Sequence, residues 1–510
     1  MRTNKIRAVL GIVTACAWLL SACSGSQGAG NGADPAGQST TAAADASASK
    51  GSAEEASVGN STENTAPTGE KTQAGTGEPA LIPLLVDRET RALHLGTYEW
   101  GGRIVGDGTV RRDALEARLR SMNETLAGKE DVAQVYVTRS DETAVSLVVC
   151  RTTEPEGVLQ YDTYVLQPET GKDLRLTDVV ADTKAFAAAF RQAAEEQLPQ
   201  EDILSDLASD QEVMDFAGEH WTLDYEGLTV YPPEAVQDAA GNIPCVAVGF
   251  EENGEAFQQS FLSQPVNYMV QMLPGRTYVQ EDAGKPVRVD HGEAVQKNKV
   301  AQYPYTLTFG ERSLVVYQVR NYPDFYMVRV GEKHFVLADL PHLETTYLTD
   351  SHTMALYDPE SISEGDQTGD TLVRYGLADQ GAFDSSHVRL FDDAFSGDNP
   401  LMLKFGINSY AYYSINSDGT FEREEPFWYL DGPEREAVRQ IDTLGYRLYD
   451  TEALVSKQIT RGMLLAPYRT DGETFLEFVG NGDVFRFEID GLDENTKLNG
   501  VYTLDMLFGS

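Results

Sequence analysis

The chain has 510 residues, and its 80 acidic residues against 40 Lys and Arg give a formal charge of −40 at pH 7. Only five basic and seven acidic residues lie before position 79, so nearly all of this charge belongs to the rest of the chain. Such an acidic balance argues against binding to nucleic acid or anionic lipid, because both need Lys and Arg to neutralise phosphates. It is compatible with a cationic partner, and equally with a solvated acidic surface that maintains solubility.

The N-terminus has the features of an export signal. Arg2, Lys5 and Arg7 precede an apolar run over residues 8–20, which is short for a bilayer-spanning helix of about 20 residues. The run ends in Leu20-Ser21-Ala22-Cys23, which resembles the lipobox of bacterial lipoproteins. The resemblance implies that residues 1–22 are a signal peptide and that Cys23 carries a diacylglycerol, whose two chains suffice as a membrane anchor. The alternatives are an uncleaved anchor and an ordinary secretory signal with a chance cysteine.

Residues 23–79 form a low-complexity segment rich in Ser, Ala, Gly and Thr. Val58 is the one large apolar side chain between positions 24 and 78. Because such a segment cannot bury enough surface to offset its loss of conformational entropy, we expect a disordered tether. The expected location of the folded part is therefore the extracytoplasmic face of the cell membrane.

Two cysteines follow Cys23, namely Cys150 and Cys245, and each lies in an apolar, strand-like run. In an oxidising compartment they can pair as a disulfide. The alternative is two buried thiols that act as small hydrophobic side chains. The sequence does not decide between the two, because it does not show whether the two strands are neighbours.

The remaining residues exceed the usual size of one domain, so we expect one unit over 80–297 and another over 298–510. In the first, apolar residues recur at helical spacing over 109–127 and 183–197. Alternating runs predict strands over 132–138, 143–152, 161–167 and 246–249, and a hairpin from 221–224 and 228–231. Helices interleaved with antiparallel hairpins predict an α+β domain.

Two segments of this first unit resemble a known family. Residues 161–180 contain a Thr170-Gly171 turn followed by Leu174 and Leu176, and residues 220–231 contain a hairpin with Gly227 at its turn. Both are similar to motifs of the extracytoplasmic domain of unknown function shared by the anti-sigma factor RsiV and the peptidoglycan deacetylase PdaC. The likeness extends through residues 233–241 and covers roughly residues 130–250. Its glycines are expected to supply turn conformations with positive φ.

The family resemblance implies an extracytoplasmic binding or sensing module. In RsiV the corresponding region recognises lysozyme, and in PdaC it accompanies a catalytic domain. This chain departs from both, because a lipid tether takes the place of a transmembrane helix. The matching residues are turn and apolar positions, so the resemblance transfers no partner-contact residue and no catalytic residue.

The second unit alternates apolar and polar residues between turns such as 416–419 and 470–472, which predicts an all-β domain, either propeller-like or a sandwich. Strands are expected over most of it, including residues 502–507, and one helix is expected over 433–443. Two aromatic runs, 410–413 and 427–429, form either a platform for sugar stacking or ordinary strand positions, and we favour the second.

No catalytic motif is recognisable in the second unit. Leu390-Phe391-Asp392-Asp393 is similar to a motif of polysaccharide deacetylases, but the two metal-binding histidines four residues apart are missing. His334, His342, His352 and His387 show no ligand spacing, and H-E-x-x-H, G-x-S-x-G and a phosphate-binding glycine loop are absent. We expect a solvated turn at Asp392 and Asp393, although the acidic residues 392–398 have Ca²⁺-ligand chemistry. No cofactor, metal or catalytic residue is expected.

These features predict a non-enzymatic, lipid-anchored envelope protein that binds or senses a ligand. The expected partners are the membrane, through the lipid, and lysozyme, another basic protein or peptidoglycan, with no nucleic acid among them. The alternatives are a divergent enzyme acting on cell-wall glycans and a passive structural lipoprotein.

Overall fold

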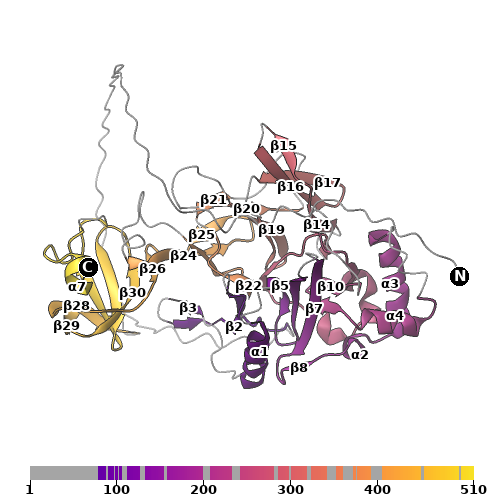
Figure 1. Ribbon diagram of the computed structural model, residues 1–510, viewed down its shortest axis with the longest axis horizontal. Helices are drawn as coiled ribbons and strands as arrows, with labels where there is room; N and C mark the ends of the chain where they lie inside the picture. Colours follow the sequence, from indigo (N-terminus) through magenta and orange to yellow (C-terminus); the bar gives the residue numbers. More distant parts are fainter. Residues whose placement is uncertain are drawn as a thin grey trace, which may run out of the picture. The chain divides into compact units, whose positions relative to one another are not determined.

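The computed structural model describes residues 78–509, apart from 88–89, 97, 101–102, 106–111, 127–131, 154–157, 199–206, 233–241, 281–284, 298–299, 319–322, 342–351, 360–370, 375, 392–404, 449–452 and 493–495. The chain after residue 76 forms one compact unit (Figure 1). Cys23, the tether as far as residue 77, and Asp392 and Asp393 lie outside the described residues. No helix among the described residues is long and apolar enough to span a membrane.

Six α-helices and two 3₁₀ turns are described in this part of the chain: α1 (Asp113–Leu126), α2 (Leu176–Val179), α3 (Thr183–Gln197), α4 (Asp210–Ala217), α5 (Phe250–Asn253), η2 (Gly254–Ala256), η3 (Gln259–Phe261) and α7 (Leu504–Phe508). The expected helix over 183–197 is confirmed as α3. It begins after Asp182, whose carboxylate accepts hydrogen bonds from the Lys184 and Ala185 amides, and it buries Phe186 and Phe190.

The strands before residue 281 form several antiparallel ladders. One sheet contains β5 (Val132–Ser140), β6 (Val145–Thr153), β7 (Val158–Gln167) and β8 (Lys172–Asp173) in that order. A second contains β11 (Val246–Gly249), β10 (Gly227–Val230) and β9 (Trp221–Leu223), and β3 (Tyr98–Trp100) pairs with β4 (Arg103–Val105). The expected hairpin over 221–231 is therefore confirmed.

A larger antiparallel sheet joins strands from distant parts of the sequence. Its described order is β2 (Leu93–Leu95), β1 (Leu84–Val86), β22 (Gln380–Phe383), β12 (Asn267–Gln271), β18 (Asp324–Val330), β19 (Lys333–Pro341), β20 (His352–Tyr357) and β21 (Thr371–Arg374). Beside it, another sheet contains β13 (Thr277–Gln280), β14 (Lys285–His291), β16 (Val300–Phe309), β15 (Val295–Lys297) and β17 (Arg312–Gln318). β15 pairs with β16 across the expected division at 297/298. One core cluster also has members on both sides of that position, so the division does not separate two cores.

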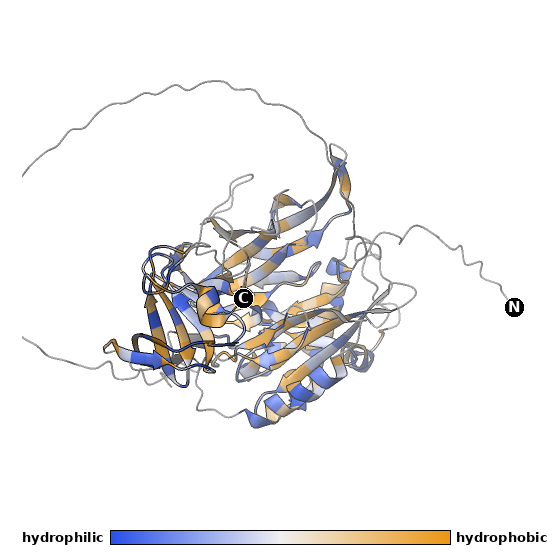
Figure 2. Cartoon of the chain, turned by 60° about the vertical axis from the view of Figure 1, so that its left-hand side comes forward, coloured by the Kyte–Doolittle hydropathy of each residue, from blue (hydrophilic) through white to orange (hydrophobic). Residues whose placement is uncertain are grey.

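The C-terminal strands form the largest described sheet. Its order is β23 (Val388–Phe391), β24 (Asn408–Ile415), β26 (Trp428–Asp431), β30 (Leu464–Thr470), β31 (Phe475–Gly480), β32 (Asp483–Glu488), β28 (Ile441–Arg447) and β29 (Val455–Ile459). β25 (Phe421–Arg423) pairs with β24, and β27 (Arg435–Glu436) pairs with β30. All strand pairs described here are antiparallel and no sheet closes on itself, so the described chain is mostly β, with a β-rich C-terminal region as predicted. Polar and apolar residues alternate along these strands (Figure 2).

Three local predictions were wrong. Residues 433–443 are not a helix, because β27 and β28 pair with neighbouring strands there and Ile441 and Thr443 are buried on alternate positions. Residues 504–508 form α7 in place of a strand, and the Thr503 hydroxyl accepts a hydrogen bond from the Met506 amide at its start. Gly171 has φ +65°, as expected, but Gly227 is not among the glycines with positive φ. It is needed because a Cβ there would lie 2.4 Å from the Val248 carbonyl oxygen.

Candidate functional site: the Arg486 pocket of the C-terminal sheet

Cys150 and Cys245 are both buried free thiols in the structure. They belong to one small core cluster with Val148, Tyr161, Tyr231, Ile243 and Leu273. Burial raises the pKa of Cys150 to about 12 and that of Cys245 to about 11. Both side chains are therefore protonated at neutral pH and act as hydrophobic residues, which removes them as nucleophiles or metal ligands.

The three described histidines after residue 298 each face a different carboxylate. His334 Nε2 lies 3.6 Å from Glu226 Oε1 in the interior, and His352 Nδ1 contacts Asp339. His387 Nδ1 lies 3.1 Å from Glu424 Oε1. In the described part of the chain no three His, Cys, Asp or Glu side chains converge as a metal site.

The two aromatic runs singled out from the sequence come together, but mostly in the interior. Tyr410 of β24 pairs across the sheet with Tyr429 of β26, and their rings stack with centroids 5.6 Å apart. Tyr412, Tyr413 and Tyr429 are each 3% exposed or less, and they pack in a core cluster with residues of β18 and β19. These three rings cannot serve as a sugar platform, and they are strand positions in a core.

The partly exposed rings of the same runs are covered by arginines. The guanidinium carbon of Arg389 lies 4.5 Å from the ring centre of Tyr410, and that of Arg423 lies 4.0 Å from Trp428. Arg469 lies 4.6 Å from Phe427. Such stacking combines cation–π attraction with burial of the arginine stem. These partly exposed rings are thus covered by stacked arginines and are not bare aromatic surfaces.

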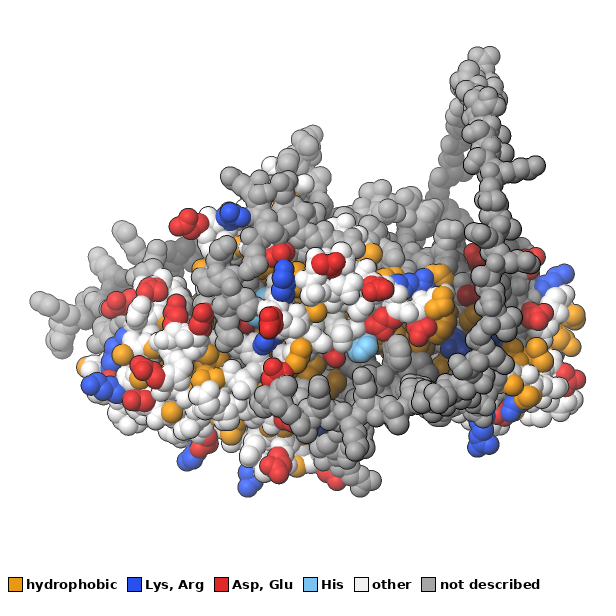
Figure 3. Space-filling model, turned by 180° about the vertical axis from the view of Figure 1, so that it is seen from behind, with side chains coloured by type: hydrophobic (Ala, Val, Ile, Leu, Met, Phe, Trp, Pro, Cys, Tyr) orange, Lys and Arg blue, Asp and Glu red, His pale blue; other side chains and the backbone are white. Residues whose placement is uncertain are grey.

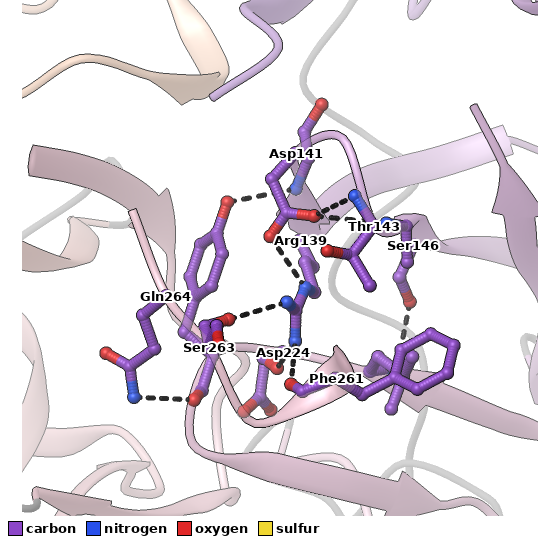
Figure 4. Close-up of polar contacts among 12 residues, drawn as sticks. Arg139, Asp141, Thr143, Ser146, Asp224, Phe261, Ser263 and Gln264 are labelled. Atoms are coloured by element: carbon purple, nitrogen blue, oxygen red, sulfur yellow. Dashed lines mark hydrogen bonds and ion pairs between the residues drawn. The ribbon is translucent and has the colours of Figure 1, made fainter. Parts of the chain in front are cut away.

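A polar network in the first half of the chain is fully enclosed (Figure 4). Arg139 and Asp141 both have no exposed side-chain surface, and Arg139 Nε donates to Asp141 Oδ2 over 2.8 Å. The remaining Arg139 nitrogens donate to the carbonyls of Phe261, at 2.7 Å, and Ser263, at 2.9 Å. Asp141 Oδ1 accepts from two backbone amides of its turn. Because its donors are satisfied and no surface is exposed, this network ties β5 to the segment after η3 and offers nothing to a ligand.

A second arginine–carboxylate cluster lies on the C-terminal sheet and reaches the surface. Glu477 of β31 is fully buried and sits between Arg469 of β30 and Arg486 of β32, each directly across a strand pair. Arg469 Nε donates to Glu477 Oε2 over 2.5 Å, and Arg486 Nε donates to Oε1 over 2.6 Å. The Tyr446 hydroxyl also donates to Oε2, over 3.0 Å. Two guanidinium groups therefore share one carboxylate, which leaves a net positive charge.

The electrostatics of this cluster favour its charged form. Burial disfavours the charged Arg469, but the charge of Glu477 and their hydrogen bond outweigh it and raise the pKa of that guanidinium. Burial, together with the charge of Glu477, also raises the pKa of Tyr446. Because a guanidinium group keeps its charge throughout the physiological pH range, the positive charge of the cluster is permanent.

An open pocket of about 700 Å³ lies at the Arg486 end of this row. Its walls come from β28, β31, β32 and the residues near them, namely Asp442, Thr443, Leu444, Leu454, Thr474, Phe475, Arg486, Glu488, Ile489 and Asn499. Arg486 stacks over Phe475 at 4.2 Å and has 27% of its side chain exposed. Leu444 and Leu454 are 41% and 43% exposed. The pocket therefore combines a fixed cation, two carboxylates and apolar side chains that face solvent.

Asn499 holds the wall of the pocket together. Its side-chain carbonyl accepts from the Glu488 amide over 2.9 Å, and its side-chain nitrogen donates to the Thr443 hydroxyl over 3.1 Å. Thr443 in turn donates to the backbone carbonyl of Arg486 over 2.5 Å. Asn499 has φ 52°, a left-handed conformation that Asn tolerates better than most residues. These bonds fix the strand that carries Arg486 relative to β28.

No protein-family model matches this chain, and no curated protein matches it either. None of the residues of this site was singled out from the sequence. The one available signal was the predicted hairpin around the 470–472 turn, whose two strands carry Arg469 and Glu477.

Proposed function

We propose that this protein is a non-enzymatic binding protein of the bacterial envelope, held at the membrane by a lipid on Cys23, and that it binds a cell-wall component through the Arg486 pocket. The observation that carries the proposal is the pocket itself, where Arg486 is held over Phe475 by the buried Glu477. Ligand sites are commonly concave, largely apolar and furnished with a few fixed polar groups, at volumes of about 300–1,000 Å³.

The mixed lining supports a wall component as ligand. Peptidoglycan presents hydroxyl and amide groups together with carboxylates and amines on its peptides. Arg486 offers guanidinium donors, and Asp442 and Glu488 offer carboxylate acceptors within the same pocket. Charge-assisted hydrogen bonds of this kind are roughly twice as strong as neutral ones. The N-terminal signal, lipobox and tether support a location where the wall is within reach.

Cosedimentation with purified peptidoglycan tests this proposal. The full chain, purified in detergent, is mixed with insoluble peptidoglycan over a series of salt concentrations. We expect wild-type protein and the control Arg447→Gln to sediment with the wall, and Arg486→Gln to remain largely in solution. Arg447 is a suitable control because it is an exposed arginine outside the pocket lining, on β28, the strand that pairs with the β32 strand of Arg486. Equal sedimentation of both variants would assign wall binding elsewhere, and no sedimentation of the wild type would remove the proposal.

A second candidate ligand is lysozyme or another basic protein, favoured by the charge of −40 and by the RsiV-like motifs. We propose that the segment of about residues 130–250, which carries the resemblance, belongs to an α+β module of that family. The two motif segments support this by lying side by side, since the Trp221 amide of β9 donates to the Thr163 hydroxyl of β7 over 3.2 Å. Acidic side chains are spread among basic ones on the face shown in Figure 3. Binding of lysozyme to the full chain that weakens steeply with salt is the expected result, and absence of binding at low salt would eliminate this candidate.

A further inference from the structure

The arrangement of charges in the Arg486 pocket defines a class of ligand, and the inference rests on the proposed function by using the same site. We propose that this pocket recognises a short peptide through its free carboxylate and its free ammonium group at the same time. The carboxylate is bound by Arg486, and the ammonium by Asp442 and Glu488. Apolar side chains of the peptide contact Leu444 and Leu454.

The carboxylate end of the site is set by the hydrogen bonds that Arg486 has already made. Its Nε is committed to Glu477, so the guanidinium plane is held in one orientation over Phe475. Among the described residues Arg486 forms an ion pair with Glu477, which is shared with Arg469. The cluster thus keeps an unbalanced positive charge. The remaining guanidinium nitrogens form the planar fork that binds a carboxylate with two hydrogen bonds.

The ammonium end of the site lies two residues further along the strands. Leu444 pairs with Arg486 across β28 and β32, so Asp442 precedes that pair and Glu488 follows it toward the same end of the pocket. Both side chains are exposed, and Asp442 Oδ1 accepts a hydrogen bond from Gln458 over 2.7 Å. Two exposed carboxylates that lie close together favour the binding of a cationic group. Ionised carboxylates only accept hydrogen bonds, and an ammonium group can donate to both of them.

The distance between the two ends sets the length of the ligand. Two residues along a strand span about 7 Å. An extended peptide advances at most about 3.3–3.6 Å per residue, so the terminal amine and carboxylate of a dipeptide are separated by a similar distance. The pocket volume of about 700 Å³ accommodates such a molecule with its side chains. Longer peptides fit where a lysine-type side chain supplies the ammonium group.

Calorimetric titration of the full chain with Leu-Leu and two derivatives tests the inference. The derivatives are the C-terminal amide, which lacks the carboxylate, and the N-acetyl form, which lacks the ammonium. We expect each derivative to bind about ten- to a hundred-fold more weakly than the free dipeptide, since hydrogen bonds to charged groups are lost. Equal binding of the dipeptide and its amide, or no binding of any of them at millimolar concentration, would overturn the inference.

Variants assign the two ends separately. Arg486→Gln is expected to remove the preference for the acid over the amide, and Asp442→Asn to reduce the preference for the free amine over the acetylated one. The matched controls are Arg447→Gln and Asp490→Asn, which change exposed residues outside the pocket lining. Asp442→Asn is remote from Glu477, so it reports on the site even if Arg486→Gln does not fold. A preference that survives Asp442→Asn unchanged contradicts the assignment of that end.

The outcomes also separate this inference from the proposed function. If Leu-Leu binds as expected but peptidoglycan does not sediment the protein, the peptide site stands and the wall-binding proposal fails. If peptidoglycan sediments the wild type through Arg486 but the acid and amide bind alike, wall binding stands and the two-ended peptide site fails.

Discussion

The Arg139 network and the Arg469–Glu477–Arg486 row contain the same residue types but have different roles in the molecule. Arg139 and Asp141 have no exposed surface, and one cation is matched by one anion and by backbone carbonyls. In the row, one buried carboxylate serves two cations, and Arg486 keeps 27% of its side chain exposed. A closed network fixes the fold, whereas an unbalanced one at the surface leaves hydrogen-bonding capacity for a ligand. Completeness of pairing distinguishes them more clearly than residue identity does.

The largest expected effect comes from breaking the closed network. Arg139→Met leaves Asp141 buried without its cation and leaves the Phe261 and Ser263 carbonyls without their donors. We expect a loss of about 3–5 kcal/mol in the free energy of unfolding. Urea denaturation followed by fluorescence measures it. A loss below about 1 kcal/mol would show that the network is not what joins β5 to the segment after η3.

A substitution at Gly227 tests the close backbone approach in the hairpin of β9 and β10. The Asp224 carboxylate accepts hydrogen bonds from the Glu226 and Gly227 amides, and a Cβ at Gly227 would collide with the Val248 carbonyl. Gly227→Ala should therefore cost about 1–3 kcal/mol. Gly254→Ala is the matched control, because its nearest neighbour is a flexible Leu262 side chain at 3.5 Å. Similar stability of the two variants by urea denaturation would contradict the close approach.

Removal of Arg486 from the Arg469–Glu477–Arg486 row should lower the free energy of unfolding by less than removal of Arg139 from the buried network. In Arg486→Gln, Glu477 keeps Arg469 and the Tyr446 hydroxyl as partners. We expect a loss of about 1.5–3 kcal/mol at most, the range for one hydrogen bond to a charged group. Arg469→Gln, which also removes the contact to Tyr446, should cost more in the same urea experiment. The reverse order would mean that Arg486 is the main structural partner of Glu477.

A pH dependence is expected in the C-terminal half from His387. The hydrogen bond to Glu424 raises the pKa of His387 above its usual value, against the opposing effect of burial. Because the folded-state pKa is the higher one, this stabilisation is complete below the unfolded pKa of about 6.5 and is lost as pH rises through the folded value. The melting temperature of wild type relative to His387→Gln should fall between pH 6 and 8. A constant difference across this range would exclude the linkage.

The smallest expected effect concerns the two thiols. Since Cys150 and Cys245 are free and their pKa values are raised by burial, a reducing agent should leave the melting temperature unchanged. Reaction with a thiol reagent should occur only after unfolding. Destabilisation by the reducing agent would show that the two cysteines form a disulfide in the protein.

Local patterns in the sequence predicted much of the fold but not its long-range pairing. Alternation and turn residues located β5 to β7, β9, β10 and most of the C-terminal strands, because those signals are local. Residues 433–443 have helical composition, and only pairing with β30 and β32 makes them strands. Likewise, β1 and β12 join β22 across about 300 and 110 residues, which no local pattern records.

The candidate site was not predicted for the same reason. Arg469, Glu477 and Arg486 are ordinary polar positions in the sequence, and they become one cluster only through the register of three strands. The aromatic runs were conspicuous, yet Tyr412, Tyr413 and Tyr429 proved to be buried. The complete burial of Arg139 could not be expected from the sequence, because a fully buried arginine is rare unless each of its hydrogen-bond donors is paired. The roles of these residues depend on which side chains pair with one another, and that pairing exists only in the folded chain.

The sharing of Glu477 by two arginines has a consequence for the kinetics of encounter. The protein as a whole repels anions at long range because its charge is −40, while the cation at Arg486 acts only within about 10 Å at ordinary ionic strength. A simple anion therefore meets a barrier before it reaches the site, and its association rate should rise with added salt. A molecule with equal positive and negative charge experiences little net repulsion, and its rate should be nearly independent of salt. The negative charge of the chain should therefore slow simple anions relative to zwitterions before any contact with the pocket is made.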